Sequence, residues 1–218
     1  MLEKMSDFFE QRLVGYDEHM LSNIESARVF YPFTASCLPN EAGIHLLDLG
    51  CGTGLELEEY LRLNPAARVT GIDLSAGMLD VLRNKFPDKE LTLIQGSYFD
   101  VPFGEECFDA AVSVESLHHF TKEKKIPLYT KLHGALVPGG YFILTDYFAL
   151  SEEEEKKHQQ ELLALRQEQG IAAGELYHYD IPLTVEHETE ALLAAGFSEI
   201  EILGSWGATF TLKAKRGH

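Results

Sequence analysis

Three alternating glycines separate an apolar run from a helix-like segment in the stretch "HLLDLGCGTGLELEEYL", residues 45–61. The order of apolar run, glycines and helix predicts a buried strand that turns sharply into a helix. Glycine at such a turn lets the backbone adopt positive φ and approach a ligand closely. Because α/β sheets hold nucleotides at the carboxyl end of a parallel strand, this stretch restricts the fold more than any other feature of the chain.

The spacing of the glycines indicates which ligand is bound. "GCGTG" at 50–54 is a G-x-G-x-G pattern, and Leu55 stands where a dinucleotide fingerprint has its third glycine. No Gly-Lys-Ser/Thr follows, so the turn is not a P-loop. Asp48 precedes the glycines and would repel a pyrophosphate, but it suits a ligand that carries positive charge. Asp73 ends the next predicted strand, where it can accept both ribose hydroxyls of an adenosine.

Short apolar runs alternate with amphipathic segments along the middle of the chain. Strands are predicted at 44–50, 68–74, 91–96, 108–114 and 140–146, and helices at 55–63, 76–86, 122–136 and 187–195. This succession predicts right-handed crossovers. The end of the chain, 198–216, predicts two further strands with a turn near 204–207. We therefore predict an α/β, Rossmann-like, doubly wound sheet of seven strands that is mostly parallel, with an antiparallel C-terminal hairpin and helices on both faces.

Two segments lie outside this alternation. Residues 1–40 are helical in pattern and predict an N-terminal helical cap, while residues 41–218 form the ligand-binding domain. Residues 151–185 form an insertion on the substrate side of that domain. Local signals support the helix starts: Ser75 and Ser151 are predicted N-caps, and Pro138 with the glycines after it is expected to end the helix before the fifth strand.

Composition narrows the class of partner. The net charge of −17 and the pI near 4.8 make nucleic acid a poorer partner than a small molecule. Three cysteines without a CxxC pair predict a reducing, cytoplasmic location without disulfides or a zinc site, and we predict no metal. Charges interrupt the first residues, and no apolar run approaches the ~20 residues of a membrane span, so we expect neither a leader nor a membrane contact.

Five segments together resemble the class I S-adenosylmethionine-dependent methyltransferase family over about residues 41–150. They are "LLDLGCGTG", "GIDLSAGML", "GSYFDVPF", "FDAAVSVESLHHF" and "LVPGGYFILTDY", in the order that the family has. The resemblance implies S-adenosyl-L-methionine as cofactor and S-adenosyl-L-homocysteine as product. The sulfonium methyl would move to a nucleophilic O, N, S or C of a small molecule by in-line displacement, a reaction in which the protein supplies orientation and electrostatics.

The resemblance also implies roles for individual residues around the cofactor. Ser97 departs from the family, which commonly has an acidic residue there to accept the adenine amino group. The match implies residues that contact the methionine part, the ribose and the adenine, and one side chain that covers the cofactor. These expected cofactor-binding residues are Asp48, Gly50, Cys51, Gly52, Asp73, Leu74, Ser97, Tyr98, Val114 and Tyr16.

The fourth strand ends in the segment expected to face the substrate. His118, His119 and Glu115 are the candidate catalytic residues there, although either histidine could instead pack or cap beneath the loop. A base is needed only when the acceptor carries a proton of high pKa. Further candidates for substrate or cofactor contact, each of which could equally pack, are Tyr31, Asp146, Tyr147, Tyr177, His178 and Tyr179.

The C-terminal part is also loosely similar to a subgroup that acts on the wobble uridine of transfer RNA with a carboxylated cofactor. That subgroup needs an arginine for the extra carboxylate, but no arginine occurs between Arg166 and Arg216, and Glu175 near the aligned position is acidic. We therefore expect ordinary S-adenosylmethionine and a small-molecule acceptor. A transfer RNA enzyme, a catalytically silent cofactor-binding protein and a homodimer are left open.

Overall fold

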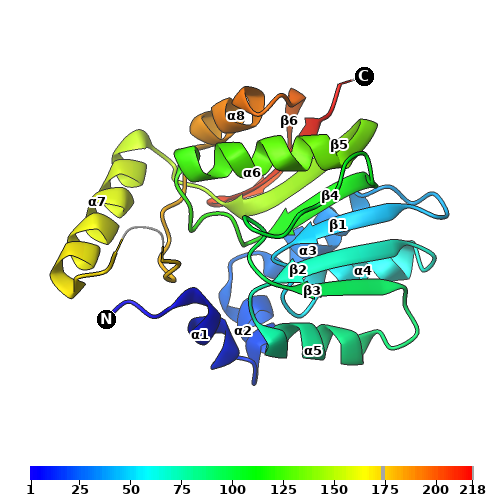
Figure 1. The fold of residues 1–218 in the computed structure, drawn as a ribbon, viewed down its shortest axis with the longest axis horizontal. Coiled ribbons are helices and arrows are strands. Elements are labelled where there is room, and N and C mark those ends of the chain that lie inside the picture. The colour runs from blue at the N-terminus through cyan, green and yellow to red at the C-terminus, as the bar shows by residue number, and fades with distance from the viewer. Residues whose placement is uncertain (173–174, 218) are drawn as a thin grey trace.

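The chain forms one seven-stranded sheet in the order β3-β2-β1-β4-β5-β7-β6 (Figure 1). The computed structural model describes residues 1–172 and 175–217, so two residues of the 151–185 insertion lie outside the described residues. The first five strands pair in parallel, and β7 is antiparallel to both β5 and β6, which confirms the predicted fold class. The strands are β1 (His45–Leu49), β2 (Arg68–Asp73), β3 (Leu91–Gln95), β4 (Phe108–Val114), β5 (Leu136–Tyr147), β6 (Ser198–Trp206) and β7 (Thr209–Lys215).

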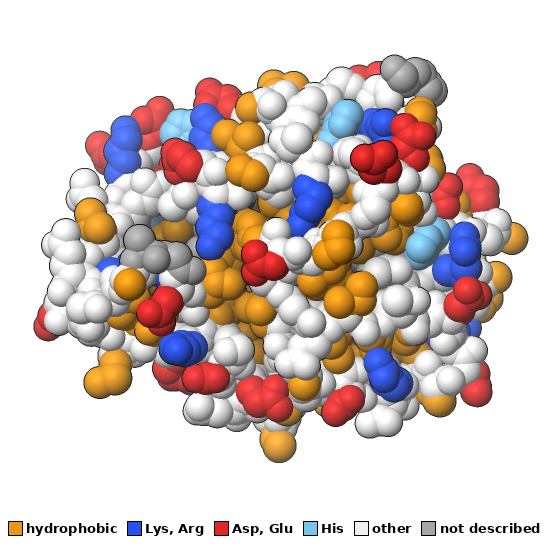
Figure 2. Space-filling view, viewed as in Figure 1, with side chains coloured by type: hydrophobic (Ala, Val, Ile, Leu, Met, Phe, Trp, Pro, Cys, Tyr) orange, Lys and Arg blue, Asp and Glu red, His pale blue; other side chains and the backbone are white. Residues whose placement is uncertain are grey.

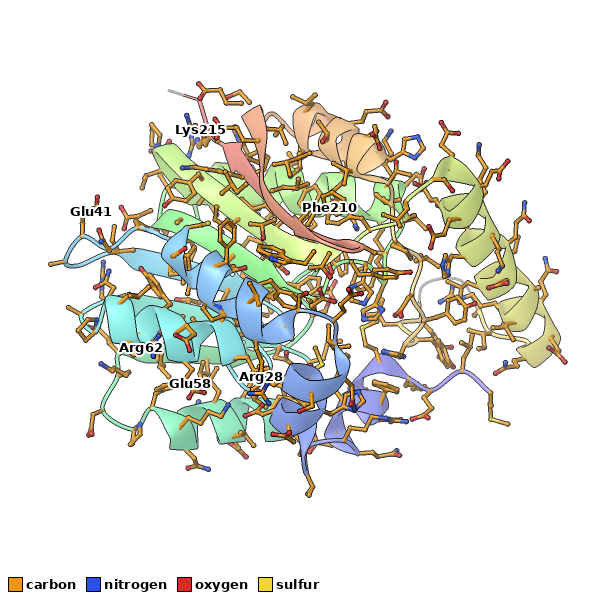
Figure 3. The ribbon with its side chains drawn as sticks, turned by 180° about the vertical axis from the view of Figure 1, so that it is seen from behind. Arg28, Glu41, Glu58, Arg62, Phe210 and Lys215 are labelled. Atoms are coloured by element: carbon orange, nitrogen blue, oxygen red, sulfur yellow. The ribbon has the colours of Figure 1, made fainter. Side chains whose placement is uncertain are left out.

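Helices cover both faces of this sheet. One face carries α3, α4 and α5. In Figure 3, α3 and α4 are seen in front of the strands and α5 lies at the lower edge of the sheet. The other face carries α6 and α8, which lie in front in Figure 1. The helices are α1 (Met5–Glu10), α2 (Tyr16–Asn23), α3 (Ala27–Ser36), α4 (Leu55–Leu63), α5 (Ala76–Lys85), α6 (Lys122–Ala135), α7 (Glu152–Gln169) and α8 (Val185–Ala194).

Each face has its own hydrophobic core, and the strands contribute to both. In β1, Leu46 packs among α3, α4 and α5, whereas its neighbour Leu47 packs beneath α6 and α8, and both are fully buried. Burying a leucine side chain stabilises the fold by about 1.5–3 kcal/mol. Because successive side chains of a strand point to opposite faces and both faces are covered, the central strands are continuous apolar runs.

Helix starts agree with the sequence, but one boundary differs. Ser75 accepts a hydrogen bond from the Met78 amide at 3.1 Å and Ser151 from the Glu154 amide at 3.2 Å, so both predicted caps are confirmed. The fifth strand, however, begins at Leu136, earlier than predicted, and the Pro138–Gly140 segment lies inside it. The pairing with β4 shifts register there, because proline cannot donate to the ladder and Gly139 has positive φ.

The segments outside the sheet meet at the carboxyl ends of its strands. Figure 1 shows α7 standing beside the sheet, and the chain after it returns toward the N-terminal helices. There Tyr177 forms a bridge with Lys4, and Ala149 forms one with Thr184. On the face shown in Figure 2, acidic side chains are scattered among lysines and arginines. None of the described helices combines the length and the apolar character that crossing a membrane requires.

Candidate functional site

The glycine turn follows β1 and adopts the backbone that its sequence predicts. Gly50, Gly52 and Gly54 have φ values of 75°, 47° and 76°. A Cβ on Gly50 would lie 2.1 Å from the Ser116 hydroxyl oxygen, and one on Gly54 would lie 2.4 Å from a Leu82 methyl. A Cβ on Gly52 would meet nothing within 4 Å. The outer two glycines therefore serve the packing of the protein itself, while Gly52 faces open space.

The carboxylate of Asp73 joins β2 to this turn. Its Oδ2 accepts a hydrogen bond from the Gly52 amide at 2.9 Å, and its Oδ1 accepts one from the Ser75 amide at 2.8 Å. Burial raises the pKa of Asp73, and these amide donors act against that rise. A carboxylate has about four lone-pair positions, so two remain for the hydroxyls of a sugar.

A second carboxylate, that of Asp48, lies beneath the turn. It is fully buried, and neither of its oxygens receives a hydrogen bond from a donor in the described part of the chain. Burial raises its pKa well above the ordinary value, and the buried carboxyl of Glu56 beside it adds to the rise. Burial also raises the pKa of Glu56, so ionisation of the pair is disfavoured.

The first two helices cover this half of the site. Glu10 accepts hydrogen bonds from the Ser75 hydroxyl at 2.6 Å and from the Gly77 amide at 3.2 Å. Asp17 accepts one from the Thr53 hydroxyl and pairs with the Lys85 ammonium, each at 2.5 Å. Contacts at the start of α5 and on the glycine turn thus hold α1 and α2 over Asp73 and Gly52.

A cavity of about 830 Å³ opens on the other half, beyond the ends of β4 and β5. Its walls come from α1, α2, the loop after β4, the 178–180 segment and the turn between β6 and β7. Of the predicted residues, those that line it are Tyr16, Glu115, His118, His119, Tyr147 and His178. The glycine turn and Asp73 are not part of its lining, so the cavity adjoins the covered turn without including it.

The floor of the cavity is a cluster of imidazoles and carboxylates. His118 Nδ1 lies 2.6 Å from Asp146 Oδ1, and its Nε2 lies 3.4 Å from Asp180 Oδ1. The same oxygen lies 3.1 Å from His119 Nδ1. Burial disfavours the charge on His118, but the two carboxylates outweigh it and raise its pKa above the ordinary value. Burial and the neighbouring His118 lower the pKa of His119.

Glu115 stands at the edge of the floor with a strained backbone. Its φ of 49° is in the left-handed region that side chains other than glycine seldom adopt. Burial, and secondly the charge of Asp146, raise its pKa to about 7. Strain of this kind persists where the surrounding structure enforces it, and it is frequent at functional sites.

Comparison with known proteins agrees with this geometry. Residues 47–144 match the family profile described as a methyltransferase domain. The carboxy-S-adenosyl-L-methionine synthase of Wolinella succinogenes is 31% identical over 96% of this chain and 93% of that protein. The biotin biosynthesis bifunctional protein BioHC of Teredinibacter turnerae is 35% identical over 47% of this chain, which spans only 19% of that longer protein.

The chain belongs to the class I S-adenosylmethionine-dependent methyltransferase family. S-adenosylmethionine is the cofactor of this family. Solved structures share the fold at low identity. The human N-acetylserotonin methyltransferase in complex with its cofactor has a TM-score of 0.67 at 18% identity, covering 96% of this chain and 58% of that one. The putative methyltransferase bound to the Trm112 activator of Haloferax volcanii has a TM-score of 0.70 at 19% identity over the full length of both chains.

The methyltransferase turn has the features that a bound adenosyl sulfonium requires. Gly52 borders open space that a side chain would fill, Asp73 keeps two free lone-pair positions, and Asp48 is a buried carboxyl without a donor. The residues present therefore fit the cofactor. Contacts of Glu10 with Ser75 and of Asp17 with Lys85 hold α1 and α2 beside the turn.

Other predicted cofactor residues of the methyltransferase are buried or already engaged. The Ser97 hydroxyl accepts a hydrogen bond from the Phe99 amide at 3.2 Å. The Tyr98 hydroxyl donates to the Ser116 carbonyl at 3.2 Å. Cys51 and Val114 are buried and Leu74 is partly buried, all among apolar neighbours. The cofactor role of each of these residues stays a prediction.

The candidates for substrate contact divide into two groups. Tyr147 and His178 line the cavity, and Asp146 supports it from behind His118. Tyr177 and Tyr179 are not part of its lining: their hydroxyls donate to Glu175 and Glu161. Tyr31 is buried among α3 side chains and does not line the cavity either.

Sequence reasoning did not anticipate several residues of the acceptor cavity. Asp180, Trp206, Thr209 and Arg12 all line it, and they come from parts of the chain that are far apart in sequence. Only Asp180 had a local signal, since it follows the aromatic run "YHY" that was singled out at 177–179. The others have no pattern that marks them, because their place depends on how the chain ends fold back over the sheet.

Proposed function

We propose that the protein transfers the methyl group of S-adenosylmethionine to a nucleophilic atom of a small molecule bound in the 830 Å³ cavity. The cavity is the observation that carries this proposal. Its volume is within the range of about 300–1,000 Å³ that is typical of small-molecule sites. Aromatic and apolar side chains line it together with many polar and charged ones, which can orient a polar small substrate.

The turn and its partners are assigned to the cofactor. Gly50, Cys51 and Gly52 would hold its methionine part and Asp73 its ribose, with Tyr16 covering it from α2. When bound there, S-adenosylmethionine supplies an electrophilic methyl carbon. The part played by the chain is to exclude water and to hold the acceptor in line, which can lower a barrier by about 7–11 kcal/mol.

The cavity floor is assigned to activation of the acceptor. Asp146 is 1% exposed and accepts hydrogen bonds from the Leu117 and Tyr147 amides as well as from His118. An imidazole that is oriented by a buried carboxylate serves either as a proton acceptor or as a metal ligand. The floor therefore suits an acceptor hydroxyl, whose proton must be removed or acidified before it attacks.

The charges of the cavity favour a neutral or cationic acceptor. Among the residues that line it in the described part of the chain, Arg12 is the single lysine or arginine. Its guanidinium is paired with the Glu3 carboxylate, with Nη1–Oε2 and Nη2–Oε1 distances of 3.1 Å each, and lies over the Phe8 ring. Glu115 and Asp180 add acidic groups to the lining.

A second candidate follows from the relative that matches almost the whole chain, which is named a carboxy-S-adenosyl-L-methionine synthase. A carboxylated product needs a cation near the sulfonium. Among the described residues of the cavity lining, the paired Arg12 is the single lysine or arginine. Transfer RNA as acceptor has the support of a human relative named a probable tRNA methyltransferase 9B, 29% identical over 53% of this chain and 23% of that one. The net charge of −17 opposes it.

Incubation of the purified protein with S-adenosylmethionine and a library of hydroxylated small molecules, followed by mass spectrometry, tests the proposal. We expect S-adenosylhomocysteine and one methylated product. Formation of carboxy-S-adenosylmethionine in place of S-adenosylhomocysteine would support the second candidate. Turnover with transfer RNA alone would contradict a small-molecule acceptor, and cofactor binding without turnover would indicate a silent binding protein.

A further inference from the structure

The side chains of His118, His119 and Asp180 converge at the floor of the acceptor cavity. The ligand-type atoms of all three lie within 4.8 Å of one another. They come from the loop after β4 and from the segment that returns after α7, so the fold brings them together from distant parts of the chain. Two imidazoles and one carboxylate are a donor set that transition-metal ions prefer.

The distances match those around a tetrahedral ion. Two donor atoms, each about 2.1 Å from a zinc ion at the tetrahedral angle, are about 3.4 Å apart. Asp180 Oδ1 lies 3.4 Å from His118 Nε2 and 3.1 Å from His119 Nδ1. These two distances therefore suit one ion, and all three ligand atoms lie within 4.8 Å of one another.

The carboxylate oxygen itself points to a missing partner. Asp180 Oδ1 is inaccessible to solvent, yet no hydrogen bond of acceptable geometry reaches it within the described residues, despite the two nearby imidazole nitrogens. This oxygen has two imidazole nitrogens within 3.4 Å but, among the described residues, no hydrogen-bond donor, so its lone pairs are available to an ion. This observation is independent of the composition of the cluster.

The residues behind the cluster are arranged as they are behind metal-bound histidines. His118 presents Nε2 to the cluster because its Nδ1–H donates to Asp146 at 2.6 Å. Asp146 is itself fixed by the amides of Leu117 and Tyr147. A carboxylate that holds the far nitrogen of a ligating histidine sets its tautomer and orientation. His119 Nδ1 lies 3.2 Å from the Tyr179 carbonyl, so its proton must move to Nε2 when an ion binds.

We infer that His118, His119 and Asp180 bind a divalent transition-metal ion, best fitted by Zn²⁺, with Asp146 as a positioning residue. Three protein ligands leave a fourth position open, and that position faces the cavity. An acceptor hydroxyl bound there loses its proton to water more readily, as a zinc-bound water does. Its oxygen then bonds to the methyl carbon, and S-adenosylhomocysteine leaves with the electron pair of the broken C–S bond. This catalytic role rests on the proposed function, whereas the site itself does not.

Titration of the chelator-treated protein with Co²⁺ tests the site, because Co²⁺ in such a site absorbs visible light. We expect one Co²⁺ per chain, displaced by Zn²⁺. The variants Asp180→Asn and His119→Gln should weaken binding more than tenfold, and Asp146→Asn by about 10–100-fold. The Asp180 side chain is 45% exposed, so its replacement leaves the core intact. The matched control is His158→Gln, which alters a histidine on α7 beside Glu154.

Absence of stoichiometric Co²⁺ and Zn²⁺ binding by the folded wild-type protein would overturn the inference, as would unchanged binding in both ligand variants. Failure of the metal inference and failure of the proposed function give different results. Metal binding without methyl transfer would refute the methyltransferase proposal and leave the site. Methyl transfer that persists in full after chelation would refute the catalytic role of the metal, while the site would still be judged by the Co²⁺ titration.

Discussion

The two halves of the site are built differently. The cofactor half comes from the ends of β1 and β2, which pair along their whole length, and its parts touch through short hydrogen bonds such as Gly52 to Asp73. The acceptor half comes from β4, β5, the N-terminal helices, the 178–180 segment and the C-terminal hairpin. The first half is dense and covered, while the second is open and lined by residues far apart in sequence. The predicted cofactor site is thus a compact local unit, whereas the cavity depends on long-range contacts.

Of the changes considered, replacing Gly52 by valine should reduce cofactor binding the most. The valine side chain would fill the open space beside the turn, and its backbone would have to hold a φ of 47°. We expect a loss of S-adenosylmethionine affinity greater than 100-fold in calorimetry, with an unchanged circular dichroism spectrum. Gly134→Val is the matched control, because Gly134 on α6 also has no neighbour within 4 Å of a Cβ. Retained affinity in Gly52→Val would remove the turn from the cofactor site.

Asp73→Ala probes the same half with a smaller effect. If both ribose hydroxyls bind this carboxylate, the variant should lose about 1–3 kcal/mol of binding free energy, or about 5–150-fold in affinity. Asp180→Asn, in the acceptor half, should leave the cofactor affinity unchanged. Equal losses in the two variants would show that the halves are not energetically separate.

Asp48→Asn tests the buried carboxyl pair beneath the turn. Because burial raises the folded pKa of Asp48 above its unfolded value, this group stabilises the fold at low pH, and that contribution is lost as pH rises through the folded pKa. The melting temperature of Asp48→Asn, relative to that of the wild type, should therefore rise as pH increases. Each kcal/mol corresponds to about 2–4 °C for a chain of this size. We expect the difference in melting temperature to change between about pH 4 and pH 9, the range over which such carboxyls titrate. A constant difference would contradict a raised pKa of Asp48.

Lys85→Ala tests the contact that holds α2 beside the glycine turn, and it has the smallest expected effect. The Asp17–Lys85 pair is partly exposed, at 34% and 23%, so it contributes at most about 1 kcal/mol. Its loss should favour outward movement of α2 and speed cofactor association by less than about fivefold in stopped-flow fluorescence. Arg62→Ala, which removes a surface pair with Glu59 on α4, is the control. Slower association in Lys85→Ala would mean that the pair guides the cofactor inward.

The sequence by itself determined the fold and the cofactor half. The fold class follows from the alternation of strands and helices, and the turn follows from glycines whose positive φ few other residues tolerate, so both are local in origin. Only the tertiary structure decided the acceptor half. Asp180 reaches the two histidines because the chain after α7 folds back over the sheet, and Trp206 and Thr209 reach the cavity from the hairpin. Such contacts depend on the packing of segments far apart along the chain, and no periodicity or spacing in the sequence encodes them.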